Sequence, residues 1–160
     1  MSERAAALAA RFEATNEALI AAVQRLSEAD WRATCPGEGW SVGVTAHHVA
    51  GYHLPVAQLA QGIAQGAALP EITREQIDAG NAQHAREHAN CTRAETLALL
   101  RRDGAAAAAI IRGLTDEQLD RTAPLAAFGG APWSAADVIE RILIGHPQAH
   151  LASIQQAIGR

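Results

Sequence analysis

Apolar residues recur at helical spacing along the long segments of this chain. In the first segment, Ala9, Phe12, Leu19, Val23 and Leu26 lie three, four or seven positions apart and therefore share one helix face. A shorter and more polar helical segment separates the second long helix from the third. The predicted long helices cover residues 2–26, 41–66, 93–113 and 134 to near the C-terminus, and the polar segment covers residues 73–90.

Local signals mark the ends and the weak points of these helices. Ser41 is a good N-cap residue, and Thr92 with Glu95 has the pattern of a capping box. Pro55 is expected to kink the second helix, because proline removes a backbone donor and clashes with the preceding turn. Gly104 is expected to weaken the third helix slightly.

A weak internal repeat relates the two halves of the sequence. The segment LSEADW at 26–31 resembles LTDEQL at 114–119, and each is followed by a loop rich in glycine and proline. Each loop ends in a Trp-Ser pair, at 40–41 and 133–134, before a long helix. Two such units predict a four-helix bundle of up-down type with long connections and a pseudo-twofold axis.

Composition supports an all-α fold. Aromatic residues make up only 4% of the chain, and alanine, the best helix former, recurs in long stretches. A chain of 160 residues fits one domain, so we expect residues 1–160 to form a single bundle domain. The alanine-rich first and third long helices offer flat faces, on which a homodimer could form.

Charge and apolar run lengths exclude some classes of protein. The net charge is -4, and all 13 basic residues are scattered arginines, which does not favour nucleic-acid binding. The sequence contains no apolar run of the roughly 20 residues that a membrane span needs, and its N-terminus does not resemble a signal peptide. We therefore expect a cytoplasmic protein with reduced thiols and without a nucleic-acid or membrane partner.

Histidines form three groups along the sequence. His146 and His150 are four residues apart on the last predicted helix, so both imidazoles can face one metal ion. A third ligand must then come from another helix, and His48, among apolar neighbours on the second helix, is the best candidate. His84 and His88 have the same spacing, but their surroundings are polar, and a solvated helix face is the favoured interpretation there.

Spacing alone leaves a second interpretation open, namely a metal-free bundle with histidines in its core. A buried histidine is more often a hydrogen-bonded core residue than a metal ligand. In a metal-free bundle, His48, His146 and His150 have no reason to converge.

Family resemblance favours the metal site. The segment from Trp40 to His53, WSVGVTAHHVAGYH, and the late segment GHPQAHLASI at 145–154 resemble the DinB superfamily, in particular its YfiT-like branch of metal-dependent hydrolases and bacillithiol transferases. The resemblance covers nearly the whole chain. It implies a four-helix bundle, often dimeric, with nickel, zinc or another divalent ion on His48, His146 and His150. Pro147 between two of these histidines departs from the expected pattern and could kink the last helix.

Three neutral histidines leave coordination positions open, which is typical of a catalytic metal site. The resemblance then implies a metal-dependent thiol S-transferase or a hydrolase that acts on a small molecule, with a low-molecular-weight thiol as co-substrate in the first case. The alternative is a non-catalytic, stress-related bundle that binds a metal or a small ligand. His47, Tyr52 and His53 are weak catalytic candidates, although packing for Tyr52 and surface exposure for the two histidines compete with this role.

The two cysteines have no clear role in the sequence. Cys35 lies in a loop, and Cys91 lies just before a predicted helix N-terminus, where the pKa of a thiol can be lowered. An inert small residue is the favoured interpretation of both.

Overall fold

The computed structural model describes residues 2–160, and almost all of them belong to helices or to short connections between helices. The elements are α1 (Glu3–Gln24), α2 (Glu28–Arg32), α3 (Val42–Gln65), α4 (Arg74–Glu87), α5 (Arg93–Arg112), α6 (Asp116–Asp120), β1 (Thr122–Leu125), η1 (Ala126–Phe128), β2 (Ala131–Ser134), α7 (Ala135–Asp137), η2 (Val138–Ile144) and α8 (Gly145–Ala157). The all-α prediction is confirmed, with one small hairpin added.

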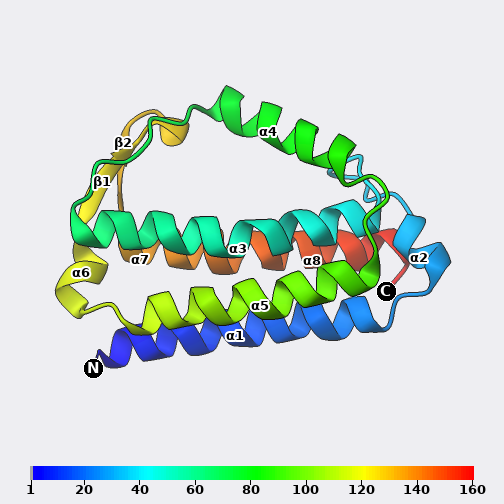
Figure 1. Ribbon diagram of the computed structural model, residues 1–160, viewed down its shortest axis with the longest axis horizontal. Coiled ribbons are helices and arrows are strands. Elements are labelled where there is room, and N and C mark those ends of the chain that lie inside the picture. The colour runs from blue at the N-terminus through cyan, green and yellow to red at the C-terminus, as the bar shows by residue number, and fades with distance from the viewer. Residues whose placement is uncertain (1) are drawn as a thin grey trace.

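Four long helical segments form the bundle: α1, α3, α5 and the continuous run α7–η2–α8. Figure 1 shows α1 and α5 side by side in one layer and α3 beside α8 in the other. The colours show that α3 and α5 run in the same direction, because residues 66–92 cross back along the bundle between them. The four-helix bundle is therefore confirmed, and its long connection makes two of the helices parallel.

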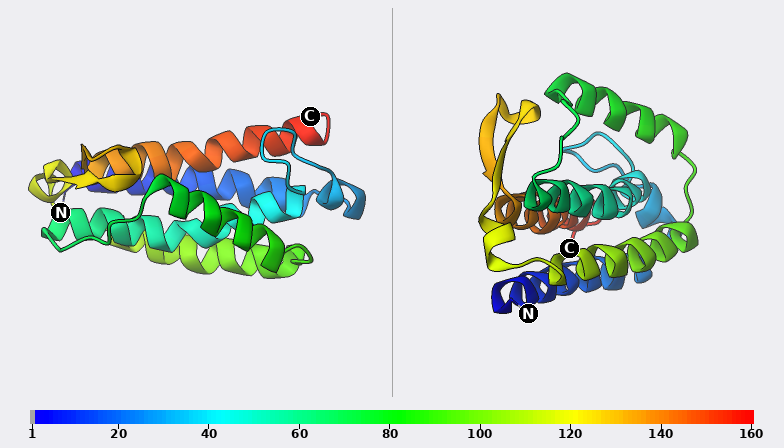
Figure 2. Two further views of the ribbon diagram at one scale, coloured as in Figure 1. Left: turned by 90° about the horizontal axis from the view of Figure 1, so that it is seen from above. Right: turned by 60° about the vertical axis from the view of Figure 1, so that its left-hand side comes forward.

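The long connection carries α4, which lies outside the four-helix bundle. Figures 1 and 2 show α4 on the outer side of α3, away from α1. Its N-terminus has the capping box of Thr73 with Gln76, whose backbone N–H donates to the Thr73 hydroxyl at 3.2 Å. No residue of α4 is fully buried, so this helix is held by half-buried and polar contacts rather than by the core.

Two of the bundle helices, α3 and α5, begin at the N-cap residues that the sequence predicts. Ser41 accepts from the Val44 N–H at 3.1 Å, and Thr92 forms a reciprocal capping box with Glu95. α3 ends at Gly66, whose φ of 67° is the left-handed conformation that favours glycine at a helix C-terminus. α3 continues through Pro55 as one helix, with the proline ring on the exposed side.

The internal repeat has a structural counterpart. In the first half, Thr34 and Ser41 form an antiparallel bridge before α3, and in the second half β1 and β2 pair with Thr122 opposite Ser134. Both serines then cap the helix that follows. The hairpin is not predicted by the sequence, because two four-residue strands rich in alanine and proline carry no periodic signal.

Two buried apolar clusters fill the interior of the bundle. One contains Phe12, Ile63, Ile111 and Ile139, and the other contains Leu19, Trp31, Val49 and Leu100. The interior also contains polar groups, among them the rings of His48 and His53, each 1% exposed. Buried polar groups need partners, so these histidines require an explanation beyond packing.

The last bundle helix changes its winding close to the histidine pair. The π-helical segment η2, Val138–Ile144, ends as the Gly145 N–H donates to the Glu140 carbonyl. Pro147 follows near the start of α8 and is buried. A π-turn holds more residues per turn than an α-helix, so it changes the direction in which His146 and His150 point.

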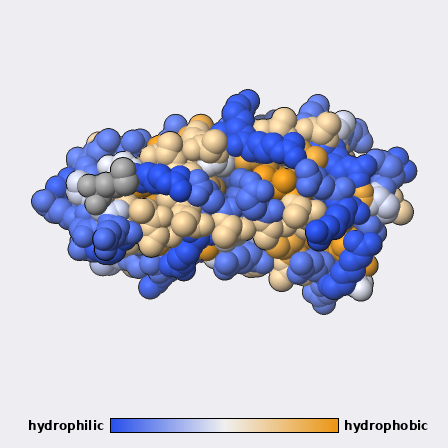
Figure 3. Space-filling model, turned by 90° about the horizontal axis from the view of Figure 1, so that it is seen from below, coloured by the Kyte–Doolittle hydropathy of each residue, from blue (hydrophilic) through white to orange (hydrophobic). Residues whose placement is uncertain are grey.

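The face on which α1 lies is a mosaic of hydrophilic and weakly hydrophobic side chains, with small strongly hydrophobic patches between them (Figure 3). No helix within residues 2–160 is both long enough and apolar enough to cross a membrane.

Candidate metal centre

His48, His146 and His150 converge inside the bundle. His48 comes from α3, and the pair comes from α8, which packs against α3. One ring nitrogen from each of the three side chains lies within 4.8 Å of the other two. The ring centroid of His48 is 5.5 Å from that of His146 and 5.1 Å from that of His150. The two helix faces thus bring His48 to a histidine pair that lies far later in the sequence.

The spacing of the nitrogens suits a small divalent ion. Nε2 of His146 and Nε2 of His150 are 2.7 Å apart, close enough for one ring to donate a hydrogen bond to the other. Two imidazole nitrogens bound tetrahedrally to one zinc ion lie about 3.4 Å apart, since each bond is about 2.1 Å long. Ion binding therefore needs only a small widening of this pair and replaces the hydrogen bond between the rings.

Glu38 fixes the orientation of His150. Its Oε1 lies 3.1 Å from Nδ1 of His150, and its Oε2 accepts a hydrogen bond from the Ser153 hydroxyl at 2.7 Å. A carboxylate at Nδ1 holds the N–H on that nitrogen and leaves the lone pair of Nε2 free for a metal ion. This arrangement is the carboxylate–histidine pair that commonly supports metal ligands.

Glu38 is not among the site residues predicted from the sequence. It lies in the loop Cys35–Gly39, which the sequence shows only as a turn rich in glycine and proline. The one available signal was that Glu38 is the only charged residue among those turn residues. Which histidine it meets depends on how the loop folds back onto α8.

Burial keeps the three histidines neutral. Burial, followed by the nearby His150 and His146, lowers the pKa of His48 to about 3. Burial and the neighbouring His150 lower the pKa of His146 to about 4. Burial also lowers the pKa of His150, although Glu38 opposes this shift. All three are therefore deprotonated at neutral pH, as a metal ligand must be.

The fit to a metal ion rests on the donor set and on one unpaired atom. Nδ1 of His48 is buried and has no hydrogen-bond partner among residues 2–160, so the described chain by itself does not satisfy this ring. Three neutral imidazoles suit zinc, nickel, copper or iron rather than magnesium or calcium, which prefer oxygen ligands. The described residues fit a divalent transition-metal ion.

Two aromatic residues pack around His48. The ring centroid of Trp40 is 5.1 Å from the His48 ring, and that of Tyr52 is 4.5 Å away. The Tyr52 hydroxyl donates to Asn81 Oδ1 in α4 at 2.6 Å. Packing is thus a clear role of Tyr52, and its hydroxyl ties α4 to α3.

His53 lies elsewhere in the core, which corrects the expectation of surface exposure. Its Nε2 is 2.8 Å from Asn16 Oδ1, and its ring meets Phe12 edge-on at 4.9 Å. Asn16 in turn donates to the Leu100 carbonyl at 3.0 Å. Within residues 2–160 no hydrogen bond joins His53 to the three converging histidines, so its contacts are those of a core residue.

His47 also differs from the expectation. It is half-buried and lies against His84 and His88 of the long connection, so these residues do not form a solvated helix face. A ring nitrogen of each lies within 4.8 Å of the other two. The sequence could not show this contact, because it depends on how α4 lies across α3.

Neither cysteine has the properties of a reactive thiol. Cys35 is fully buried, and Cys91 is half-buried. Burial raises the pKa of both thiols, so the lowered pKa considered for Cys91 does not occur.

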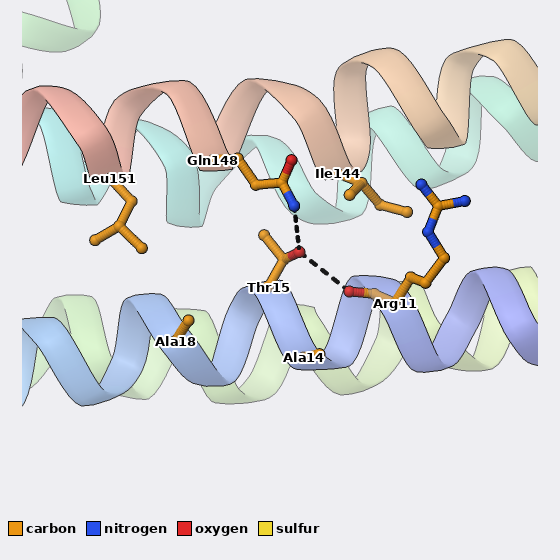
Figure 4. A pocket seen from close by; sticks show the side chains of 7 residues that line it. All are labelled: Arg11, Ala14, Thr15, Ala18, Ile144, Gln148 and Leu151. Atoms are coloured by element: carbon orange, nitrogen blue, oxygen red, sulfur yellow. Dashed lines mark hydrogen bonds between the residues drawn. The ribbon is translucent and has the colours of Figure 1, made fainter.

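Little open space adjoins the three histidines. A cavity of about 10 Å³ borders Tyr52, His53 and His146. A larger groove of about 360 Å³ lies between α1 and α8 and is lined by Arg11, Thr15 and Gln148 (Figure 4). We consider the histidine cluster the functional site, because the groove contains one charged side chain and no grouping of chemically reactive residues.

The fold and the site together define a class of protein, a four-helix bundle with a three-histidine cluster in its interior. The sequence profile of the DinB superfamily matches residues 11–154, and the chain belongs to this superfamily. A solved structure, YfiT from Bacillus subtilis, described as a probable metal-dependent hydrolase with an unusual four-helix bundle topology, is similar to this chain in fold. The two share 18% identity with a TM-score of 0.77, over 99% of this chain and 90% of the other. A search of curated proteins gives no match.

Proposed function

We propose that this chain is a metal-dependent enzyme that acts on a small molecule, with the ion held by His48, His146 and His150. The observation that carries the proposal is the convergence of three buried, neutral histidines, one of them oriented by Glu38. Such an ion would act as a Lewis acid that lowers the pKa of a water or a thiol at an open position. The description of YfiT as a probable metal-dependent hydrolase agrees with this proposal.

The chain supplies a neutral and largely water-free setting for this chemistry. Because all three ligands are uncharged imidazoles, the full charge of the ion would favour an anionic nucleophile. The Trp40 and Tyr52 rings cover His48 and exclude solvent from it. Glu38 is already paired with His150 and Ser153, so its role is to position His150 rather than to accept a proton from the substrate.

Both hydrolysis and thiol transfer are compatible with three neutral histidine ligands in a buried site. In hydrolysis the nucleophile comes from water, and in transfer it comes from a small thiol that displaces a leaving group from an electrophile. The shared requirement is loss of one proton from the nucleophile at neutral pH. A small-molecule substrate and a homodimer stay predictions of the sequence.

A second candidate is a non-catalytic bundle that binds a metal ion or a small ligand. The observation in its favour is the cavity beside His146, whose volume of about 10 Å³ leaves no room for a substrate. Under this alternative the ion is bound and stored, and no turnover accompanies it.

Metal content tests the site first. Untagged protein purified without chelator is analysed by mass spectrometry, next to His150→Ala and to Gln155→Ala, an exposed position on the same helix. We expect His150→Ala to lose about one zinc or nickel ion per chain and Gln155→Ala to lose none. Equal metal content in all three proteins contradicts the assignment.

Activity is tested on the metal-loaded protein in two arms. One arm follows hydrolysis of small esters and amides without thiol, and the other follows consumption of cysteine or glutathione with a small electrophile. Turnover in one arm that disappears in His150→Ala identifies the reaction class. Metal binding without turnover in either arm supports the non-catalytic alternative.

A further inference from the structure

The second group of histidines repeats the architecture of the first. His84 and His88 are an i,i+4 pair on α4 and at its C-cap, as His146 and His150 are a pair on α8. In both groups the third ring comes from α3, His47 in one and His48 in the other. Adjacent residues on a helix point about 100° apart. His47 therefore faces α4, and the next residue, His48, faces α8.

We propose that His47, His84 and His88 form a second transition-metal site, which joins α4 to α3. One nitrogen of each side chain lies within 4.8 Å of the other two, the same limit that describes the first group. His47 Nδ1 and His84 Nε2 are 2.8 Å apart, close to the roughly 3.4 Å that two nitrogens on one zinc ion require. The rings of His47 and His88 are stacked at 4.2 Å, so rotation of His88 completes the set.

One ring nitrogen of this group has no partner within the described chain. Nδ1 of His84 is buried and has no hydrogen-bond partner among residues 2–160. Buried imidazole nitrogens are normally paired, and only two buried side-chain atoms of the described chain are unpaired, one in each histidine group. Because Nε2 of the same ring faces His47, the unpaired Nδ1 points away from the proposed ion, and the convergence of the three rings carries the proposal.

The electrostatic surroundings also favour a cation. The carboxylates of Glu87 and Glu95 lie close enough to His84 and His47, respectively, to act on them as negative charges. Three imidazoles select zinc, nickel or copper over magnesium and calcium.

The position of the site gives it a consequence for the fold. α4 contributes no residue to either buried cluster, and the Tyr52–Asn81 hydrogen bond is one of its few links to α3. An ion shared between His47 and the α4 pair would fasten this helix over the outer side of α3. The His84 ring of α4 lies 5.8 Å from the His48 ring, so the second ion would also hold α4 beside the first site.

The decisive experiment removes the first site and measures how many metal ions per chain still bind. The variant His146→Ala/His150→Ala, purified without tag or chelator, is titrated with Zn²⁺ and Ni²⁺ by calorimetry, with Mg²⁺ as a negative control. We expect about one ion per chain to bind in this background. Adding His84→Ala should weaken that binding by about 100-fold or more, since even the loss of a supporting outer group costs 10–100-fold. Adding Gln83→Ala, an exposed neighbour of His84, should leave it unchanged.

A second readout does not depend on affinity alone. α4 contains Arg86 on its exposed face, so limited trypsin digestion reports on whether this helix opens. Zn²⁺ should slow cleavage after Arg86 in the double variant and should have no such effect once His84→Ala is added. Circular dichroism confirms that each variant is folded.

Two results overturn the proposal. One is a double variant that binds no zinc or nickel, and the other is binding that persists unchanged after His84→Ala. Neither result bears on the first site, because loss of metal from His150→Ala alone is measured separately.

Discussion

At the scale of single residues, the site depends on a carboxylate that is not itself a candidate ligand. Glu38 accepts from Ser153 and pairs with Nδ1 of His150, so it determines which nitrogen of that ring faces His146. A ring held in one tautomer and one orientation loses less entropy when it binds an ion. Glu38 should therefore influence metal affinity strongly without touching the ion.

We expect Glu38→Ala to weaken zinc binding at His48, His146 and His150 by about 10–100-fold. The variant should remain folded, because Glu38 lies on a loop and none of the apolar core depends on it. Calorimetric titration of the two proteins measures the change. Glu71→Ala, an exposed glutamate on another loop, is the matched control, and equal affinities of the Glu38 variant and this control contradict the assigned role.

His53 gives the protein a measurable sensitivity to acid. Burial lowers its pKa to about 4, whereas the unfolded chain has an ordinary histidine pKa of about 6.5. Between these values the unfolded state binds a proton that the folded state does not, so the free energy of unfolding falls as pH falls. The stabilising contribution is complete above about pH 6.5 and is progressively lost toward about pH 4.

His53→Gln should remove the pH-dependent contribution of His53 to the free energy of unfolding. Glutamine keeps a donor for Asn16 but does not titrate. Denaturant unfolding of metal-free protein at several pH values is the measurement. From about pH 6 to about pH 4.5, the wild type should lose up to about 1.4 kcal/mol per pH unit more than the variant. Parallel pH dependences of the two proteins contradict the assigned burial effect.

At the scale of the elements, close packing of α1 against α5 explains a glycine that helix propensity alone disfavours. A Cβ at Gly104 would lie 2.2 Å from Asn16 Nδ2, far inside contact distance. The Asn16 side chain cannot easily move away, because both of its ends are hydrogen-bonded, to the Leu100 carbonyl and to His53. Gly104 is thus a point of close helix approach rather than a simple weakness of α5.

Gly104→Ala should therefore destabilise the protein, although alanine is the better helix former. Disrupting the Asn16 hydrogen bonds costs about 1–3 kcal/mol, which exceeds the gain of about 1 kcal/mol in helix propensity. Gly51→Ala in α3 is the matched control, because nothing lies within 4 Å of a Cβ there, and it should stabilise by about 0.5–1 kcal/mol. Thermal unfolding measures both, and stabilisation by Gly104→Ala contradicts this account.

At the scale of the whole molecule, the bundle and α4 differ in how they are held. The four bundle segments share the buried apolar clusters, whereas α4 rests on half-buried histidines and on the Tyr52–Asn81 hydrogen bond. Segments with few buried apolar contacts open at lower free energy than the core. If the proposed function holds, opening of α4 is the expected route by which a small molecule would reach the three histidines.

Tyr52→Phe tests this division of the molecule. The substitution removes the hydrogen bond to Asn81 and retains the ring on His48, so it should make α4 open more readily by about 1 kcal/mol, or roughly fivefold. Amide hydrogen exchange should show faster exchange in residues 74–87 and unchanged exchange in α1 and α5. Uniform acceleration throughout the chain would instead indicate a general loss of stability.

The sequence by itself determined the helices and the first set of candidate ligands. Apolar spacing and caps such as Ser41 and Thr92 are local properties, and a local pattern states where a helix begins and which face is buried. The i,i+4 spacing of His146 and His150 is local too. The apolar neighbours of His48 distinguish it from the adjacent His47, and the family resemblance supports the same choice.

Only the tertiary structure decided the remaining contacts, because each joins residues from separate elements. It brought Glu38 from a loop to His150, buried His53 against α1, and set His47 against α4. The π-turn of η2 influences where His146 and His150 point, and no residue pattern in that segment predicts it. Helix formation depends on neighbours in sequence, whereas the chemistry of this protein depends on which helix faces meet.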